Sequence, residues 1–453
     1  MPRHLGLWPF LLTGCMPAVR ADIERLQAGV TQMRLKEDAR EDPASGTLAD
    51  DMGLDKRLLE PLDLETLVEA ALARNPMLRE SVARSQAALE EVSRAGALDD
   101  PSFKVEAWAV PLHQPLAFNR DDTNQFGLME TFPFPGKLGL RAESALREAE
   151  ATHQLSRARE RDVIAELKRT YFTYFMLSKE LEVHREHVRL LEDFEKISEE
   201  KLKNGTAPEQ DALKAQVELV MLHSDVLFLE QRIGSAKGAI NALLSRPGGA
   251  PLGKAKEVSL SEERYSLEAL QEKALSARPE LQAAKLKREA ALVSQKLAER
   301  EALLPDFTLG VDYWQQPDRS DAWGGLVSIN LPWLTGKRSA EARKMQYAAR
   351  AEALALEQNQ NRVLYEVRDA FLRVEAARKS VVLIQGELLP KSQQSVDVTR
   401  SGYEKAKASF QELLEAERSQ RNVMISYYRG LAEYESAVAD LERAIGSNLR
   451  EKS

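Results

Sequence analysis

Hydrophobic and polar positions along this chain recur with two different periods. Over residues 138–203 and again over 338–402, apolar side chains return every three or four positions, as on one face of an α-helix. At 102–133 and 305–333, shorter segments alternate with a period of two, which is typical of β-strands. The pattern therefore predicts a mainly helical protein that contains two β-hairpins.

The same order of segments occurs twice. The segment that begins at Leu64 matches the one that begins at Leu267 at an offset of 203 residues, and after the hairpins the offset becomes 200. Matching apolar positions continue along the helical segments of both halves. We therefore predict a tandem duplication, with a first repeat at 62–250, a second at 251–447 and a short tail at 448–453.

Each repeat is predicted to contain three helical parts and a hairpin. A first helix carries an early proline, which either kinks or breaks it. A continuous helix of about 66 residues, roughly 100 Å long, follows the hairpin. A tip and a return helix complete the repeat, and the shorter helices can pack end to end along the long one as a coiled coil. The predicted bounds are 64–98 and 267–303 for the first helix, 138–203 and 338–402 for the long helix, and 209–245 and 409–445 for the return helix.

The predicted strands have one apolar and one polar side. Phe103 and Val105 share a side, as do Leu309 and Val311, while Val327 alternates with polar Ser328. Strands of about ten residues with this pattern can cross a bilayer at a tilt. A soluble hairpin packed on helices is the alternative. Four strands cannot close a barrel, so in a membrane they need strands from other chains.

Composition bounds the class of protein. A chain of 453 residues with 43% hydrophobic and 30% charged residues can bury a large core, and its net charge of −8 is spread out, which argues against nucleic-acid binding.

The amino-terminal segment points to export. The only cysteine, Cys15, follows a basic start, an apolar run and Leu12-Thr13-Gly14. This stretch resembles a bacterial lipobox and predicts a signal peptide at 1–14, lipidation of Cys15 and an acidic segment at 15–61. An ordinary signal peptide is the alternative. In bacterial lipoproteins an aspartate directly after the cysteine retains the protein in the inner membrane. This chain has Met16 at that position, so the resemblance implies the outer membrane.

Two similar stretches, "FPFPGK" and "LPWLTGK", lie between the hairpins and the long helices. Neither has the upstream glycine of a phosphate-binding loop. Proline ends strand pairing, glycine permits a sharp turn, and we expect each lysine to face interfacial water. The stretches are therefore predicted to be strand-to-helix joints, formed by Pro135, Gly136 and Lys137, and by Pro332, Gly336 and Lys337.

Catalytic and metal-binding patterns are weak. Of the six histidines, only His184 and His187 share a helical face, with no third ligand nearby, and His184 occupies an apolar position. We expect both to be packing residues. The sequence predicts no enzyme, no catalytic residue, no metal site and no cofactor.

From about residue 62 to 447 the chain resembles the TolC-type outer membrane efflux family. "FPFPGKLGLRAESA", with the preceding "ALDDPSF", is similar to members that serve heavy-metal cation efflux. The resemblance implies a homotrimer in which four strands per chain form a 12-stranded β-barrel in the outer membrane and the long coiled-coil helices form an α-barrel in the periplasm. It also implies a periplasmic adaptor and an inner-membrane pump of the resistance-nodulation-division type as partners.

The resemblance assigns roles at the helical tips. It implies that Gly205, Thr206 and Ala406 contact the adaptor, that Tyr403 and Asp211 lock the closed entrance, and that Glu412 and Glu415 form an acidic ring favouring cations. Where the family has a gate arginine, this chain has Ala408. Two solvated helix carboxylates are the alternative interpretation of Glu412 and Glu415.

Three functions are therefore considered. The first is a passive exit duct for heavy-metal cation or drug efflux. The second is an exit duct for type I protein secretion, and the third is a lipid-anchored periplasmic coiled-coil structural protein. Strand hairpins at matching places in both halves favour a duct, because a coiled-coil scaffold does not need them.

Overall fold

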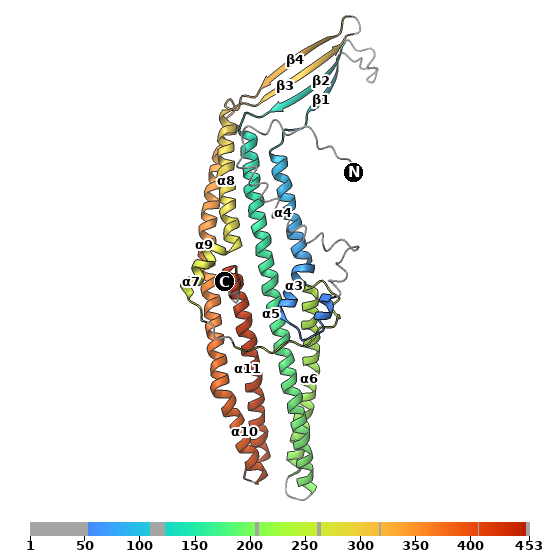
Figure 1. The fold of residues 1–453 in the computed structure, drawn as a ribbon, viewed down its shortest axis with the longest axis vertical. Coiled ribbons are helices and arrows are strands. Elements are labelled where there is room, and N and C mark those ends of the chain that lie inside the picture. Colours follow the sequence, from blue (N-terminus) through green and yellow to red (C-terminus); the bar gives the residue numbers. More distant parts are fainter. Residues whose placement is uncertain are drawn as a thin grey trace. The chain divides into compact units, whose positions relative to one another are not determined.

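The computed structural model describes residues 53–108, 123–203, 208–260, 264–316, 319–405 and 407–449. Within them the chain is mainly helical with one small sheet, which confirms the predicted fold class. Cys15, the signal segment and most of the acidic segment lie outside the described residues. The helices shown in Figure 1 are α3 (Leu64–Arg74), α4 (Pro76–Ala95), α5 (Lys137–Lys203), α6 (Glu209–Leu243), α7 (Leu267–Ala277), α8 (Pro279–Leu303), α9 (Lys337–Leu383), α10 (Leu389–Glu404) and α11 (Phe410–Ile445).

The chain divides into two compact units. Among the described residues, the first unit contains 81–156 and 280–359, which include the whole sheet. The second contains the remaining described residues, from 53–80, 157–279 and 360–449. Each unit therefore takes segments from both repeats.

The sheet joins the two repeats side by side. Its strands are β1 (Ser102–Trp108), β2 (Thr123–Phe132), β3 (Phe307–Gln315) and β4 (Ala322–Ile329), antiparallel in that order (Figure 1). The central pair, β2 with β3, runs from Asn124 opposite Gln315 to Phe132 opposite Phe307. β2 and β3, one from each repeat, form the centre of the sheet, and β1 and β4 form its two edges.

The early proline of each repeat breaks the first helix rather than kinking it. Asn75 before Pro76 and Arg278 before Pro279 both have extended backbones, with ψ of 120°, because the proline ring disfavours the helical conformation of the preceding residue. The Asn75 side chain stabilises the break: its Oδ1 accepts from the Met77 N–H at 2.9 Å, and its Nδ2 donates to the carbonyl of Leu243 at 2.9 Å. The result is α3 followed by α4, and α7 followed by α8.

The second long helix is not continuous, contrary to the prediction for 338–402. α9 ends at Leu383, a π-helical turn covers Ile384–Leu388, and α10 follows. The cause is Pro390, in the first turn of α10. Its ring lacks an N–H and would meet the carbonyl four residues earlier, and a wider turn avoids this collision. The prediction was wrong because it did not account for this proline; α5, which contains none, is unbroken over 67 residues.

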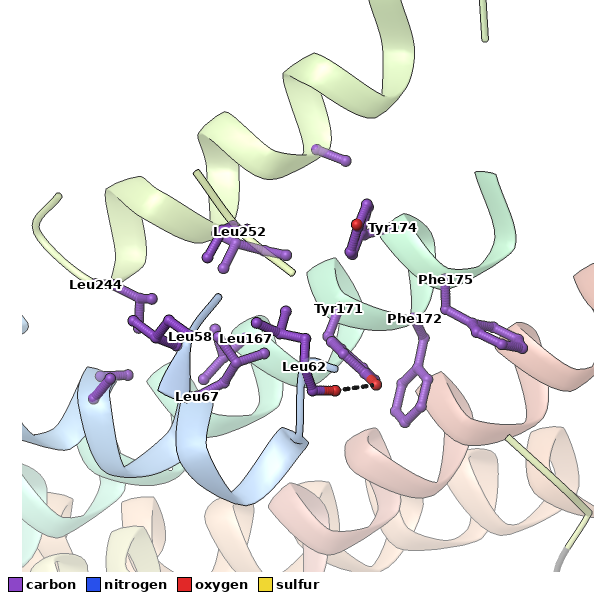
Figure 2. Close-up of a cluster of buried hydrophobic side chains, with 14 of the residues drawn as sticks. Leu58, Leu62, Leu67, Leu167, Tyr171, Phe172, Tyr174, Phe175, Leu244 and Leu252 are labelled. Atoms are coloured by element: carbon purple, nitrogen blue, oxygen red, sulfur yellow. Dashed lines mark hydrogen bonds between the residues drawn. The ribbon is translucent and has the colours of Figure 1, made fainter. Parts of the chain in front are cut away.

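The second unit has a large apolar core where α3, α5 and the end of α6 meet. Figure 2 shows Leu62, from the start of the first repeat, beside Tyr171 of α5. Phe175 of α5 points away from the leucines, and its ring centroid lies 6.4 Å from that of Tyr428 in α11. The Tyr171 hydroxyl donates to the carbonyl of Leu62 at 3.0 Å and accepts from the N–H of Lys256 at 3.2 Å. Burial raises the pKa of Tyr171 to about 12, so the phenol stays neutral and holds both segments.

Candidate functional site

The sheet has one apolar and one polar face. Register places the predicted apolar positions together: Phe103 lies opposite Leu128, and Leu309 opposite Val327. Their side chains are 68%, 55%, 48% and 68% exposed, so no part of the described chain covers this face. It is formed by Phe103, Val105, Phe126, Leu128, Phe132, Phe307, Leu309, Val311, Tyr313, Trp323, Val327 and Ile329, with Asn124, Glu130 and Gln315 as polar exceptions. So many exposed apolar side chains on one surface indicate an apolar environment such as lipid.

The opposite face carries ions and hydroxyls, beside the apolar side chains of Met129, Trp314 and Leu326. Lys104 and Glu106 form an ion pair at 2.7 Å, and Thr131 lies 3.0 Å from Thr308 between their hydroxyl oxygens. Asp312 lies directly opposite Gly127, where a Cβ atom would come within 2.4 Å of the carboxylate. The two faces therefore fit two media, lipid on one side and water on the other.

Both predicted joints contain a sharp turn at glycine. Gly136 and Gly336 have φ of +89° and +68°, a backbone conformation that side chains disfavour. Pro135 and Gly136 immediately precede α5, and Gly336 immediately precedes α9. The duplicated sequence thus builds the same turn twice.

The lysines of the two joints differ, and the expectation that Lys137 faces water is wrong. The Lys137 side chain is 1% exposed because its ammonium group binds the Asp306 carboxylate at 2.7 Å and the Leu304 carbonyl at 2.8 Å. Asp306 also accepts from the backbone N–H of Phe134 at 3.2 Å. Lys137 therefore ties the start of α5 to the entry of β3.

Lys337, at the second joint, is exposed and forms no ion pair with any described residue. Its neighbour Arg338 binds Glu301 at 2.9 Å. Pro332 is buried, whereas Trp333 and Leu334 are 54% and 68% exposed. The second joint thus lacks, within the described chain, the partner that covers the first.

At the tips, Gly205, Thr206 and Ala406 lie outside the described residues. Glu412 is exposed in the first turn of α11, where Ser409 and Glu412 form a capping box. The Ser409 N–H and hydroxyl donate to the Glu412 carboxylate at 2.7 and 2.9 Å, and these bonds lower the pKa of Glu412. Capping α11 is therefore one role of this carboxylate, whichever medium it faces.

The other predicted tip residues lie near the ends of α6, α10 and α11 and are not all joined. Glu415 is exposed, one turn after Glu412. The Tyr403 ring packs against Phe410, with centroids 5.8 Å apart. Asp211 lies half-exposed in the first turn of α6, and the structure has no hydrogen bond between it and Tyr403. The expected lock between Tyr403 and Asp211 therefore stays a prediction.

Sequence reasoning missed two buried ion clusters near the tips. The Glu218 carboxylate of α6, 4% exposed, binds Arg418 and Arg421 of α11, the latter at 3.3 Å. Burial raises the pKa of Glu218. The hydrogen bonds and positive charges of the two arginines lower this pKa by more than burial raises it, so the net shift is downward. The carboxylate therefore stays charged and links α6 to α11, helices from different repeats.

The second cluster links three helices. The Glu417 carboxylate of α11 accepts from Arg400 of α10 at 2.9 Å and lies 4.0 Å from Nε2 of His187 in α5. His187 is 7% exposed, and burial lowers its pKa, so it is neutral near pH 7.

The sequence contains a signal for both clusters. Glu218 and Glu417 occupy positions in apolar helical stripes, such as Ala215 to Leu222, where a charged side chain is unusual.

A charged cavity of about 610 Å³ lies in the second unit, among residues of α5, α9 and α11. Asp440 in its wall binds Arg169 at 2.5 Å and Arg373 at 3.2 Å. Arg443 likewise binds Asp162 at 2.5 Å. Because these arginines are paired with carboxylates, they link the three helices rather than offering open anion-binding groups.

Metal ligation and membrane-spanning helices were also considered. Among the described residues, no group of three or more histidine, cysteine, aspartate or glutamate side chains could hold a metal ion. Nδ1 of His184 lies 2.8 Å from the carbonyl of Glu180, within its own helix. None of the helices in the described part of the chain is long and apolar enough to cross a membrane.

Comparison with known proteins places this architecture. Solved structures with the same fold include VceC from Vibrio cholerae, at 19% identity and a TM-score of 0.72, covering 85% of this chain and 97% of that one. CmeC from Campylobacter jejuni is 15% identical with a TM-score of 0.72, and the match covers 86% of this chain and 87% of CmeC. CusC is 19% identical with a TM-score of 0.72, and the match covers 87% of this chain and 94% of CusC. No curated protein matches the sequence significantly.

The family comparison follows the duplication. The model of the outer membrane efflux protein family matches residues 67–244 and 270–447, one stretch in each repeat and together well over half of the chain. The two-faced sheet, the duplicated helices and this match agree, and the chain belongs to the outer membrane efflux protein family.

Proposed function

We propose that this chain is the outer membrane exit duct of a tripartite efflux system, passively conducting substrates that an inner-membrane pump of the resistance-nodulation-division type delivers through a periplasmic adaptor. The observation that carries the proposal is the sheet, which has an exposed apolar face, a polar face and two open edges. Open edges are not tolerated in lipid, so the sheet needs strands from other copies. A homotrimer with a 12-stranded barrel meets this need.

Anchoring and adaptor contacts complete the proposal. Lipidation of Cys15 holds the chain at the outer membrane, and the tips around Gly205, Thr206 and Ala406 receive the adaptor. Heavy-metal cations or drugs are the proposed cargo, and the resemblance of "FPFPGK" to metal-efflux members favours the cations. The fold itself does not choose between these cargoes, since the described residues offer no metal-binding cluster.

The closed entrance is proposed to depend on the buried ion clusters as well as on Tyr403 and Asp211. Ala408 stands where the resembled family has an arginine, and Glu218 with Arg418 and Arg421 supplies a link between helices of the two repeats. Glu412 and Glu415 provide the acidic charge that favours cations at the opening.

Conductance of the purified full-length protein in planar bilayers tests the proposal. We expect channels that favour cations, and a reduced preference in the double variant Glu412→Gln with Glu415→Gln, because up to six carboxylates would leave a trimeric opening. The matched control, Glu268→Gln with Glu272→Gln in α7, removes the same charge from another helix and should leave selectivity unchanged.

The outcomes separate the candidates. Absence of channels would favour the coiled-coil structural protein. Channels with unchanged selectivity in the tip variant would contradict the roles of Glu412 and Glu415 alone. Transport of a polypeptide by the reconstituted system, instead of small solutes, would favour type I secretion.

A further inference from the structure

His187 of α5 is a buried histidine whose second ring nitrogen is unused. Nδ1 lies 3.0 Å from the carbonyl of Val183, one turn earlier in α5, so Nδ1 carries the proton of the neutral ring and donates it to this carbonyl. Nε2 is buried and has no hydrogen-bond partner among the described residues, although it lies 4.0 Å from Oε2 of Glu417 in α11. A second proton would therefore bind at Nε2, beside a carboxylate.

The helices around this nitrogen already carry an excess of positive charge. Their titratable and charged side chains are His184 and Glu186 of α5, Glu218 of α6, Arg400 of α10, and Glu417, Arg418 and Arg421 of α11. The three arginines bind the two buried carboxylates, Glu218 and Glu417, which leaves one positive charge in excess. A proton on the histidine would add a second positive charge, which is costly in a buried cluster.

The balance of these influences makes the packed arrangement sensitive to acid. Burial lowers the pKa of His187 below its ordinary value of 6.5, and Arg421 adds to this effect. The Val183 carbonyl and the carboxylates of Glu186 and Glu417 oppose the shift without reversing it. The packed arrangement is therefore fully favoured above about pH 6.5 and loses stability as the pH falls below it. An ordinary glutamate titrates at about pH 4.3, so mild acid acts on the histidine first.

α10 is the helix that the added charge can release. Of its 16 residues only Val396 is buried within the described chain, so charged contacts carry much of its attachment. Arg400 donates to Glu417 at 2.9 Å, and its guanidinium lies 5.8 Å from the ring centre of Phe194 in α5. The Arg400 side chain is 40% exposed and that of His187 is 8% exposed. When both are charged, the arginine is therefore the one that can turn into water.

Both ends of α10 suit a local movement. The helix begins after the π-helical turn at Ile384–Leu388, which interrupts the hydrogen-bond pattern of α9, and a Cβ atom on Gly386 within this turn would meet nothing within 4 Å. Near its other end lies Tyr403, whose ring packs against Phe410 of α11. A movement of α10 therefore carries with it the tyrosine that is proposed to close the entrance.

We propose that His187 is a proton-operated release for α10. In mildly acidic surroundings a proton from the solvent binds Nε2, the imidazolium takes the carboxylate of Glu417, and Arg400 turns into water. The attachment of α10 to α5 and α11 weakens, and the closed entrance opens more readily. The role at the entrance rests on the proposed function, whereas the release of α10 itself does not require a channel.

Hydrogen exchange of the purified full-length protein tests the release. Exchange in α10, corrected for the intrinsic pH dependence of the chemistry, should become several-fold faster between about pH 7.5 and about pH 5.5. His187→Gln should remove this acceleration, because an amide does not titrate. The matched control, His223→Gln at an exposed histidine of α6, should keep it. His187→Leu, which fills the buried position with an apolar group, should also remove the acceleration and serves as the second test if the glutamine variant folds poorly.

Channel recordings in planar bilayers test the role at the entrance. The open probability of the wild type should rise over the same pH interval and stay constant in His187→Gln. Exchange in α10 that does not respond to pH in the wild type, or that still responds in both His187 variants, would overturn the release. Accelerated exchange without a rise in open probability would overturn the role at the entrance. Absence of channels would contradict the exit duct, and the exchange measurement would still decide on the release.

Discussion

Glu218 shows how one residue can link two repeats. Its carboxylate is buried and bound by arginines of α11, so protonation removes the charge on which both bonds depend. Since the pKa of Glu218 is below its ordinary value, near 4.3 for glutamate, the stabilisation is complete above that ordinary value and is lost as the pH falls through the lowered pKa. The link therefore holds at neutral pH and fails only in acid.

Substitution of Glu218 tests this link. Glu218→Gln should weaken the contact between α6 and α11 by roughly 1–3 kcal/mol, because two arginines lose their charged acceptor. Hydrogen exchange should become faster in those two helices at pH 7, with little further change in acid. The exposed control, Glu415→Gln, should leave exchange near wild type. Unchanged exchange in Glu218→Gln would contradict the assignment.

Residue-level expectations depended on neighbours that the sequence does not show. Lys137 was expected in water because lysine is usually exposed; its burial follows from Asp306 and the Leu304 carbonyl, which lie more than 160 positions away. Glu412 could be identified as a helix-capping residue from Ser409 three positions before it. Contacts with residues a few positions away in the sequence can be predicted, whereas contacts with residues far away in the sequence cannot.

At the level of elements, the two joints have one backbone and different surroundings. A Cβ atom on Gly136 would lie 2.5 Å from a guanidinium nitrogen of Arg300, whereas one on Gly336 would meet nothing within 4 Å. Both positions have positive φ, so alanine is strained at each. A difference in stability between Gly136→Ala and Gly336→Ala thus reports the contact with Arg300, and not the strain of the turn itself.

The paired substitutions make a quantitative comparison. Gly336→Ala should cost about 1–2 kcal/mol of unfolding free energy from backbone strain, and Gly136→Ala should cost more, because Arg300 must also move. Urea midpoints of the two variants in the same detergent provide the measurement. Gly234→Ala in the interior of α6 is the control and should not destabilise, since alanine favours helix there. Equal losses at the two joints would contradict the role of Arg300.

Helix boundaries were predictable where the chain itself determines them. Pro76 and Pro279 each disturb the helix in either case, and both end it, because the residues before them, Asn75 and Arg278, have extended backbones. At Pro76 the hydrogen bonds of the Asn75 side chain stabilise the break. Pro390 is equally visible in the sequence, so the missed π-turn came from giving the hydrophobic period too much weight over a single residue. Periodicity predicts that a helix exists better than it predicts continuity.

For the whole molecule, the orientation of the sheet is the most testable feature. Val311, in the middle of β3, is 57% exposed on the apolar face. Val311→Arg should cost about 2–4 kcal/mol of folding into lipid vesicles, because it places a charge against hydrocarbon. Ser328→Arg, on the polar face of β4, should be tolerated. Folding yields in vesicles of fixed composition compare the two, and equal yields would mean that the apolar face does not meet lipid.

The architecture as a whole was readable from the sequence because duplication repeats each signal. Two hairpins and two Gly-Lys joints at matching positions support each other in a way that one copy could not. The order of strands, with β2 beside β3, was not determined by the pattern, since edge and central strands have similar alternation here. Which surfaces remain open depends on that order.

Duplication also changes how the molecule assembles. The pairing of β2 with β3 joins the two repeats within one chain, so its rate of formation does not depend on protein concentration. A half-length ancestor would have needed a collision between molecules for every such contact. Because the two repeats are covalently linked, only contacts between separate copies of the present chain depend on their concentration.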